Sequence, residues 1–188
     1  MNQGLEIEGF LHPLREQACR DRLWRPVAQP RGTALMTQGG TTPALYVLCA
    51  GLVKLAYLTP EGGERIKSFI VDLGVFGAGT SDADARFSAI TLEPSTIVAL
   101  PSSWFTARLN DNPAIRAAYA GFEAWLRARK EAREEALLCQ SAEARYLDLL
   151  RHEPGLVQRL QQADIARYIG VTPIAFSRIK RRVARQAR

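Results

Sequence analysis

The chain has 188 residues, 47% of them apolar, and its 25 Lys and Arg against 19 Asp and Glu give a net charge of +6. This length suits one sizeable core with a small second module. A membrane-spanning helix is excluded because no run of about eighteen apolar residues occurs, and the acidic start at Glu6 and Glu8 is unlike a secretory signal. The sequence therefore predicts a cytoplasmic protein.

Three cysteines are spread along the chain at Cys19, Cys49 and Cys139, without a Cys-x-x-Cys pair or a nearby histidine cluster. An odd number at such wide spacing fits neither a disulfide framework nor a metal site. We expect buried or idle thiols in a reducing cytoplasm, no bound metal and no cofactor.

Glycine-containing turns punctuate residues 31–101 at intervals of roughly 8–12 residues, which is typical of an all-β sandwich or barrel. The runs between the turns are rich in branched and aromatic residues, which favour strands. The glycine pair after Pro60 and Glu61 predicts a hairpin between two antiparallel strands. This half is predicted to be a β-roll or jelly roll with strands over residues 45–48, 52–58, 65–71 and 96–100.

A long helix is predicted after Asn112, a suitable cap, with Pro113 at its first position. Apolar and small residues recur along it at spacings of three and four, interrupted by Arg129, which is the pattern of a coiled-coil seam. The seam predicts a homodimer held by this helix; alternatively the helix lies on its own β domain, where Tyr119 and Leu126 can also pack. The seam residues are Ile115, Ala118, Phe122, Trp125, Arg129, Ala132, Ala136 and Cys139.

A stretch near the C-terminus has the spacing of a helix-turn-helix. A first helix over residues 162–169 turns one apolar face inward, Gly170 can take the positive φ that ends a helix, and Val171 fills the corner. Thr172 can cap the second helix through its hydroxyl, and Pro173 suits the first helical position. An ordinary helical hairpin with a basic surface is the alternative interpretation.

Charge favours DNA as the partner of this segment. From Arg145 to the end the chain has ten Lys or Arg and three Asp or Glu, a net +7, whereas the preceding residues have 15 and 16, a net −1. A localised cationic block suits a phosphate backbone better than a membrane, because no broad exposed apolar stripe accompanies it. Phe176 and Ile179 are expected to pack on the first helix. The residues predicted to contact DNA are Thr172, Pro173, Ile174, Ser177, Arg178, Lys180, Arg181, Arg182 and Arg185.

Four motifs, in the order β-roll, central helix, helix-turn-helix, carry a resemblance that covers nearly the whole chain. They are Tyr46-Val-Leu-Cys-Ala-Gly-Leu-Val-Lys-Leu, Pro60-Glu-Gly-Gly-Glu-Arg-Ile, Asn110-Asp-Asn-Pro and Ala163-Asp-Ile-Ala-Arg-Tyr-Ile-Gly-Val-Thr. The chain resembles the Crp/Fnr superfamily of bacterial transcription regulators. The expected fold class is α+β.

The resemblance implies a homodimer whose paired recognition helices enter successive major grooves of double-stranded DNA. It also implies a contact with RNA polymerase if the protein is an activator. The implied organisation is a cyclic-nucleotide-binding-like sensor over residues 1–112, a dimerisation helix over 113–139 and a DNA-binding domain over 140–188.

The sequence differs from the superfamily's cyclic-nucleotide-binding members at the positions that contact the nucleotide. Binding members carry a Gly-Glu pair that holds the ribose and an Arg-Ser pair whose Arg binds the cyclic phosphate, but here Ala78 and Phe87 occupy those two positions. Arg86 lies one residue early, and a one-residue slip in a strand turns a side chain to the opposite face. The adenine-binding Thr-Ser pair would fall near Lys130 and Glu131, so cyclic AMP is not the expected effector. The degenerate effector pocket comprises Phe76, Gly77, Ala78, Arg86, Phe87 and Ser88.

Two other sensors of the superfamily leave signatures in a sequence. An iron–sulfur cluster would need four thiolates, three of them near the N-terminus, where only Cys19 lies. A haem would need axial donors, and the only histidines, His12 and His152, are expected at the surface in a loop or helix end. The effector is therefore an unfamiliar molecule, another protein, or none.

The recognition helix also departs from the common pattern in its first turn, so base preference cannot be copied. Arg178 matches the later Arg that contacts guanine and is suited to bidentate bonding with O6 and N7. The chain ends at Arg188 without the strands of the usual wing. Arg181, Arg182 and Arg185 are expected to supply backbone contacts instead.

Two other functional classes share features with this sequence. A cupin-type enzyme shares the jelly roll but needs several histidines on its strands, and the predicted strands have none. No Ser-His-Asp or Cys-His set can be assembled either, so no enzyme is expected. The remaining alternative is a regulatory protein-interaction module, such as an anti-regulator that forms inactive heterodimers, with a vestigial DNA-binding domain.

Overall fold

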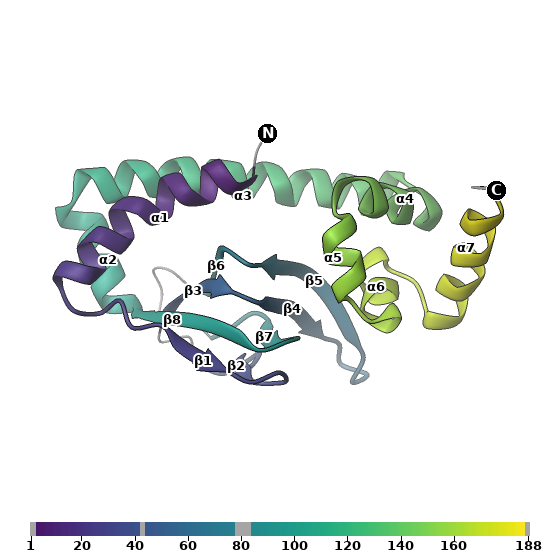
Figure 1. Cartoon of the computed structure of the whole chain (residues 1–188), viewed down its shortest axis with the longest axis horizontal. Helices are drawn as coiled ribbons and strands as arrows, with labels where there is room; N and C mark the ends of the chain where they lie inside the picture. The colour runs from purple at the N-terminus through teal and green to yellow at the C-terminus, as the bar shows by residue number, and fades with distance from the viewer. Residues whose placement is uncertain (1–2, 42–43, 78–83, 187–188) are drawn as a thin grey trace.

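The computed structural model describes residues 3–41, 44–77 and 84–186 (Figure 1). The described helices are α1 (Gln3–Arg20), α2 (Ser102–Asp111), α3 (Pro113–Cys139), α4 (Ala142–His152), α5 (Pro154–Arg159), α6 (Gln162–Ile169) and α7 (Pro173–Gln186). The strands are β1 (Val27–Gln29), β2 (Ala34–Met36), β3 (Ala44–Ala50), β4 (Leu52–Leu58), β5 (Glu64–Val71), β6 (Gly74–Gly77), β7 (Ser88–Thr91) and β8 (Ser95–Pro101). None of these helices is long and apolar enough to cross a membrane.

Two antiparallel four-stranded sheets pack face to face and form a β-roll. Their strand orders are β1-β8-β3-β6 and β2-β7-β4-β5, and the hairpin expected after Pro60 joins β4 to β5. The four expected strands lie within β3, β4, β5 and β8, so the prediction of an α+β chain with a β-roll is confirmed. Both sheets contribute to one buried cluster: Met36, Leu48, Val53, Leu55, Phe76, Ala85, Ala89 and Ile97.

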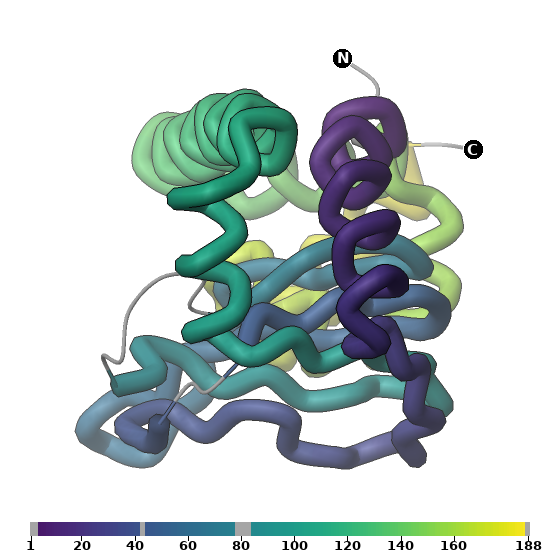
Figure 2. Tube along the Cα trace, turned by 90° about the vertical axis from the view of Figure 1, so that its left-hand side faces the viewer, coloured from purple at the N-terminus to yellow at the C-terminus, as the bar shows by residue number. Residues whose placement is uncertain are grey.

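An N-terminal helix that the sequence analysis did not predict lies alongside the long helix (Figures 1 and 2). The apolar residues of α1 recur at spacings of three and four, which is the pattern that buries one face of a helix. The ring of Phe10 stacks on that of Phe122 in α3, with centroids 4.8 Å apart. The buried residues of α1 are Ile7, Phe10, Leu11, Leu14 and Ala18.

The position of α1 corrects the expected dimer seam. Ile115, Phe122 and Trp125 of α3 are only 0%, 6% and 9% exposed, because α1, α2 and the β-roll of the same chain cover them. Ala118 is half-buried in the same cluster. Ile115, Phe122 and Trp125 cannot line a contact with a second chain while they stay packed in their own, whereas the half-buried Ala118 keeps some exposed surface.

The C-terminal helices form the helix-turn-helix that the sequence predicted. Gly170 ends α6 with φ of +83°, and the Thr172 hydroxyl accepts a hydrogen bond of 3.2 Å from the amide of Ala175 in α7. Phe176 and Ile179 are buried against α6 and α4. Helices α4 and α5, which precede this motif, were not predicted. No strand follows α7 within the described part of the chain.

The helix-turn-helix rests directly on the β-roll. Leu52, Ile66 and Phe69 of β4 and β5 share one buried cluster with the apolar faces of α4 to α7. Arg133 of α3 adds hydrogen bonds to the Ile66 and Lys67 carbonyls of β5 and to the Tyr168 carbonyl of α6, the last at 2.6 Å. One side chain thereby joins three elements at the junction.

Candidate nucleic-acid interface and effector pocket

Helix α7 has one buried and one solvent-facing side, as an amphipathic recognition helix requires. Its first turn presents Ile174, which is 71% exposed, and Ser177 is half-buried one turn later. Pro173 begins the helix and Thr172 caps it. Thr172 and Pro173 are exposed, so all four predicted residues of this end lie at or next to the surface.

The basic residues of α7 differ in their partners. Arg182 forms an ion pair with Glu143 of α4, with Nε and Oε2 2.5 Å apart. The other four candidates form no ion pair with any residue that the structure describes. Arg182 is thus paired within the fold while its side chain stays 60% exposed, and the phosphate contact that the sequence predicted stays a prediction. The unengaged and exposed candidates are Arg178, Lys180, Arg181 and Arg185.

The degenerate effector pocket is filled by apolar side chains. Phe76 is 5% exposed and stacks on Tyr46, with ring centroids 5.3 Å apart. Phe87 packs against the same interior cluster, whereas its neighbour Arg86 is exposed. Both residues precede β7, so the strand alternation on which the sequence expectation rested does not apply to them, although their exposures differ.

The remaining pocket residues have structural contacts. Gly77 has φ of +107°, and a Cβ atom there would lie 2.7 Å from the Ala44 carbonyl, so only glycine fits. Ser88 is buried and its hydroxyl accepts a 3.0 Å hydrogen bond from the Gln38 amide. Ala78, where the ribose-binding Glu would stand, lies outside the described residues.

One residue of this region was missed by the sequence analysis. In the pairing of β4 with β5, Leu55 lies opposite Ser68 and Ala56 opposite Ile66, so Lys67 is the extra residue of a β-bulge. Its Nζ lies 4.8 Å from the centroid of the Phe87 ring. Half-burial, with repulsion from Lys130 and Arg133 of α3, lowers the pKa of Lys67 to about 8.

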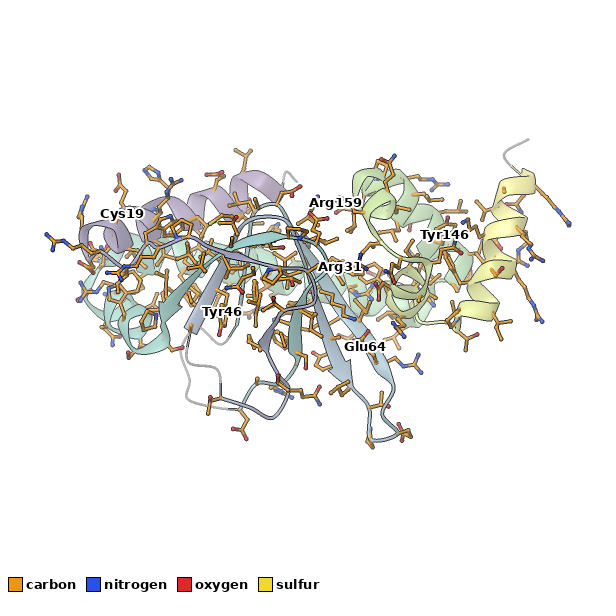
Figure 3. The ribbon with its side chains drawn as sticks, turned by 60° about the horizontal axis from the view of Figure 1, so that its bottom comes forward. Cys19, Arg31, Tyr46, Glu64, Tyr146 and Arg159 are labelled. Carbon is orange, nitrogen blue, oxygen red and sulfur yellow. The ribbon has the colours of Figure 1, made fainter. Side chains whose placement is uncertain are left out.

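Two ion-pair groups at the junction were also missed, because their members are far apart in the sequence. Arg159 of α5 binds Asp72 and Glu93 of the β-roll. Lys54 of β4 lies 2.8 Å from Glu64 of β5 and 3.9 Å from Asp164 of α6. Figure 3 labels Arg159 and Glu64, which lie where the sheet meets the C-terminal helices.

A cavity of about 320 Å³ lies at the same junction. It is bounded by α1, β5, α3, α5 and α6, and its walls combine apolar side chains with charged ones such as Asp72 and Glu153. Its volume therefore depends on how the C-terminal helices sit on β5. The lining residues include Ile7, Phe69, Arg129, Leu156 and Tyr168.

One exposed stripe of α3 carries small side chains. Gly121 has no atom within 4 Å of the place where a Cβ would be, so the surface there is open. Of the predicted seam, only Ala132 belongs to this exposed stripe; Ala136 is half-buried, and the exposed guanidinium of Arg129 lies 5.0 Å from the Trp125 ring. The small-residue face comprises Ala114, Ala117, Gly121, Ala124, Ala128 and Ala132.

No cluster of three potential metal ligands occurs among the described residues. His12 is exposed, as expected, but lies within α1 rather than at a helix end; His152 is the last residue of α4. Cys19, Cys49 and Cys139 are unpaired thiols.

Comparison with known proteins identifies the fold. Residues 26–112 match the cyclic nucleotide-binding domain family. No curated protein matches the chain in sequence. The chain is similar to the solved structure of FixK2 from Bradyrhizobium japonicum, with 17% identity over 87% of this chain and 86% of that one and a TM-score of 0.77.

Two further solved structures are similar over most of their length. CLP, a c-di-GMP-responsive global regulator from Xanthomonas campestris, has 15% identity over 98% of this chain and 93% of its own, with a TM-score of 0.73. A Crp/Fnr-family transcriptional regulator from Eubacterium rectale has 14% identity over 93% and 87%, with a TM-score of 0.75. Residues 26–112 are therefore similar to a cyclic nucleotide-binding domain, and the whole chain has the fold of these regulators, which confirms the resemblance inferred from the sequence.

Proposed function

We propose that this chain is a Crp/Fnr-type transcription regulator that binds double-stranded DNA through α7. The observation that carries the proposal is the set of exposed cations on α7, led by Arg178 and Arg181, which have no acidic partner among the described residues. Cations without partners on one face of a helix suit phosphate and guanine contacts in a major groove. If the regulator is an activator, it also contacts RNA polymerase.

The regulator acts as a homodimer through the small-residue face of α3. Small side chains at spacings of three and four let two helices approach closely. The dimer brings two copies of α7 to successive major grooves, as the reading of paired half-sites requires. The exposed Leu138, at the end of the same helix and 78% exposed, supports a contact that continues toward the DNA-binding domain.

The regulator does not respond to cyclic AMP. An interior already occupied by Phe76 and Phe87 supports this, since an apolar ring at the Arg position cannot neutralise a cyclic phosphate. Loss of a charge-assisted hydrogen bond typically costs roughly 1.5–3 kcal/mol. Calorimetry with cyclic AMP tests this directly, and a micromolar Kd would contradict it.

Selection from random double-stranded DNA by the full chain, followed by gel shifts across a salt series, tests the proposal. Enrichment of a two-fold symmetric site, with half-sites about 10 base pairs apart, is the expected result. The double variant R178A/R181A should lose the selected site, whereas R20A on the distant α1 should keep it. Failure to enrich any sequence would favour the protein-interaction alternative, an anti-regulator with a vestigial helix-turn-helix.

A further inference from the structure

Four exposed side chains form a single row along α7. They are spaced by four, three and four positions, so they lie above one another on one side of the helix. The buried Phe176 and Ile179 and the half-buried Val183 lie on the opposite side, in the apolar cluster that α7 shares with α4 and α6. The row therefore faces directly away from the fold. Its members are Ile174, Arg178, Arg181 and Arg185.

Ile174 is the apolar member of this row. It is 71% exposed and lies in the first turn of α7. A single exposed apolar residue is common on protein surfaces and has no meaning by itself. Its neighbour in the row, however, is Arg178, which has no acidic partner among the described residues. A polyanion that binds the cations of the row therefore covers Ile174 as well.

The major groove of DNA offers one apolar group to such a side chain. Each base pair presents hydrogen-bond donors and acceptors at this edge, and thymine alone adds a C5 methyl group. The side chain of Ile174 can neither donate nor accept, so it would leave polar base edges without partners. Phosphates suit it no better, because they bind cations and hydrogen-bond donors. The methyl group of thymine is thus the contact that this position favours.

The row also relates this thymine to the guanine that Arg178 is expected to read. Arg178 is four residues beyond Ile174, and a helix rises about 1.5 Å per residue, so the two side chains leave α7 about 6 Å apart along its axis. Base pairs are stacked about 3.4 Å apart. Roughly one or two base-pair steps therefore separate the two contacts when α7 lies in the groove.

We propose that Ile174 contacts the C5 methyl group of a thymine in each half-site, roughly one or two base pairs from the guanine contacted by Arg178. The inference rests on the proposed function and deepens it, because it assigns part of the base sequence that the regulator recognises. Ile174 is then a specificity-determining residue. Since it makes no phosphate contact, its loss should not change the dependence of DNA binding on salt.

Replacement of single thymines of the selected site by deoxyuridine tests the proposal, because this exchange removes only the methyl group. At one thymine near the guanine whose preference is lost in R178A, the exchange should weaken binding by the parent about three- to fivefold, as expected for one methyl group withdrawn from contact. I174A should bind the thymine duplex with a similar loss and should not distinguish it from the deoxyuridine duplex. I174V keeps a branched apolar side chain and should retain most of the discrimination.

Two controls separate a base contact from a general loss of binding. I174A should keep the salt slope of the parent, and circular dichroism establishes that it is folded. Leu5 of α1 is also 71% exposed but lies outside α7, so L5A should bind both duplexes like the parent.

Three results would overturn the contact and leave the proposed function intact. They are no weakening of the parent at any deoxyuridine, equal weakening of the parent and I174A, and a selected half-site without a thymine within about two base pairs of a guanine. Failure of the parent to enrich any site would instead overturn the proposed function, and this contact with it.

Discussion

Arg159 of α5 holds Asp72, in the turn between β5 and β6, through hydrogen bonds of 2.7 Å from Nη1 and 2.9 Å from Nη2, one to each carboxylate oxygen. The same guanidinium donates to Glu93 and to the Gly51 carbonyl. Because the planar guanidinium bonds two carboxylates, it fixes their orientation as well as their distance from Arg159. This side chain therefore helps to fix α5 on the β-roll.

Asp72→Asn should loosen that junction without unfolding either part. The hydrogen bonds from Arg159 lower the pKa of the Asp72 carboxyl. The ionised carboxylate therefore adds its full share to the free energy of unfolding above the ordinary pKa of aspartate, and this share is lost as the pH falls through the lowered pKa. Hydrogen exchange should therefore quicken in α5 at neutral pH. The exposed Asp84→Asn is the control; unchanged exchange in the Asp72 variant would mean that the apolar contacts alone hold α5.

Arg145 is expected to be a large contributor to stability. It donates to the Ile169 carbonyl at the end of α6 and to the Ala136 and Gln140 carbonyls at the end of α3, so it closes two helix ends at once. A hydrogen bond from a charged group contributes roughly 1.5–3 kcal/mol, and Arg145→Ala should lower the free energy of unfolding by about 3 kcal/mol.

Chemical denaturation measures that loss. Arg145→Lys should recover only part of it, because an ammonium lacks the fork that reaches both helices. Arg151→Ala, on the same helix but exposed and paired only with Asp148, should cost less than about 0.5 kcal/mol. Similar losses at both positions would refute this role of Arg145.

Arg178 and Arg185 should differ in how they support DNA binding. Arg178→Ala should cost roughly 1–3 kcal/mol on the selected duplex and little on a scrambled one, as expected for a residue that reads a base. Arg185→Ala should weaken both duplexes alike and flatten the slope of log affinity against log salt by about 0.9. Titrations of both duplexes at several salt concentrations distinguish the two roles. Equal losses of affinity on both duplexes for Arg178→Ala would show that Arg178 does not read a base.

The dimer should depend on the small face of α3 rather than on its aromatic residues. Ala124→Glu places a charge in the small-residue face and should give monomers in sedimentation at micromolar concentration. Arg127→Glu, at an exposed position outside that face, should leave the dimer intact. Trp125→Ala should instead lower the stability of each protomer, by roughly 3–5 kcal/mol for a buried aromatic residue. A dimeric Ala124→Glu variant would move the interface elsewhere.

Lys67 should make the stability of the ligand-free protein depend on alkaline pH. Its pKa is lowered to about 8 in the folded state, so between about 8 and its ordinary value the unfolded chain holds the proton more tightly. Stability should therefore rise with pH in this window, by up to roughly 1.4 kcal/mol per pH unit. K67M should be more stable than the parent at pH 7 and should lack this rise. If Lys67 is not the source of this rise, denaturation curves from pH 7 to 10 will show the same increase of unfolding free energy with pH in K67M and in the parent.

Local patterns in the sequence were sufficient for the helix-turn-helix and for strands β3, β4, β5 and β8, whereas the shorter strands β1, β2, β6 and β7 were not predicted. The φ of Gly170, the cap at Thr172 and the hairpin after Pro60 each follow from residues a few positions apart. Phe122 and Trp125 of the predicted seam have an apolar partner in their own chain, which is α1. The spacing of apolar residues in α1, such as Ile7 and Phe10, was not taken as the sign of a helix.

Contacts between distant segments could not be read from local patterns. The pairing of Arg182 with Glu143, and the bulge that exposes Lys67 to Phe87, depend on the register of packed elements. A count of charges does not distinguish Arg182, which has an acidic partner, from the other cations of α7. Only three-dimensional packing separates a cation used by the fold from one available to a ligand.

The cluster that Leu52, Ile66 and Phe69 share with the C-terminal helices makes the two halves one cooperative folding unit. Calorimetry should then show a single unfolding transition, with equal calorimetric and van't Hoff enthalpies. A chimera that carried the helix-turn-helix of a relative would bring a foreign surface against β4 and β5. Exchange of DNA specificity between such proteins therefore has to transplant the facing strand residues together with the helices.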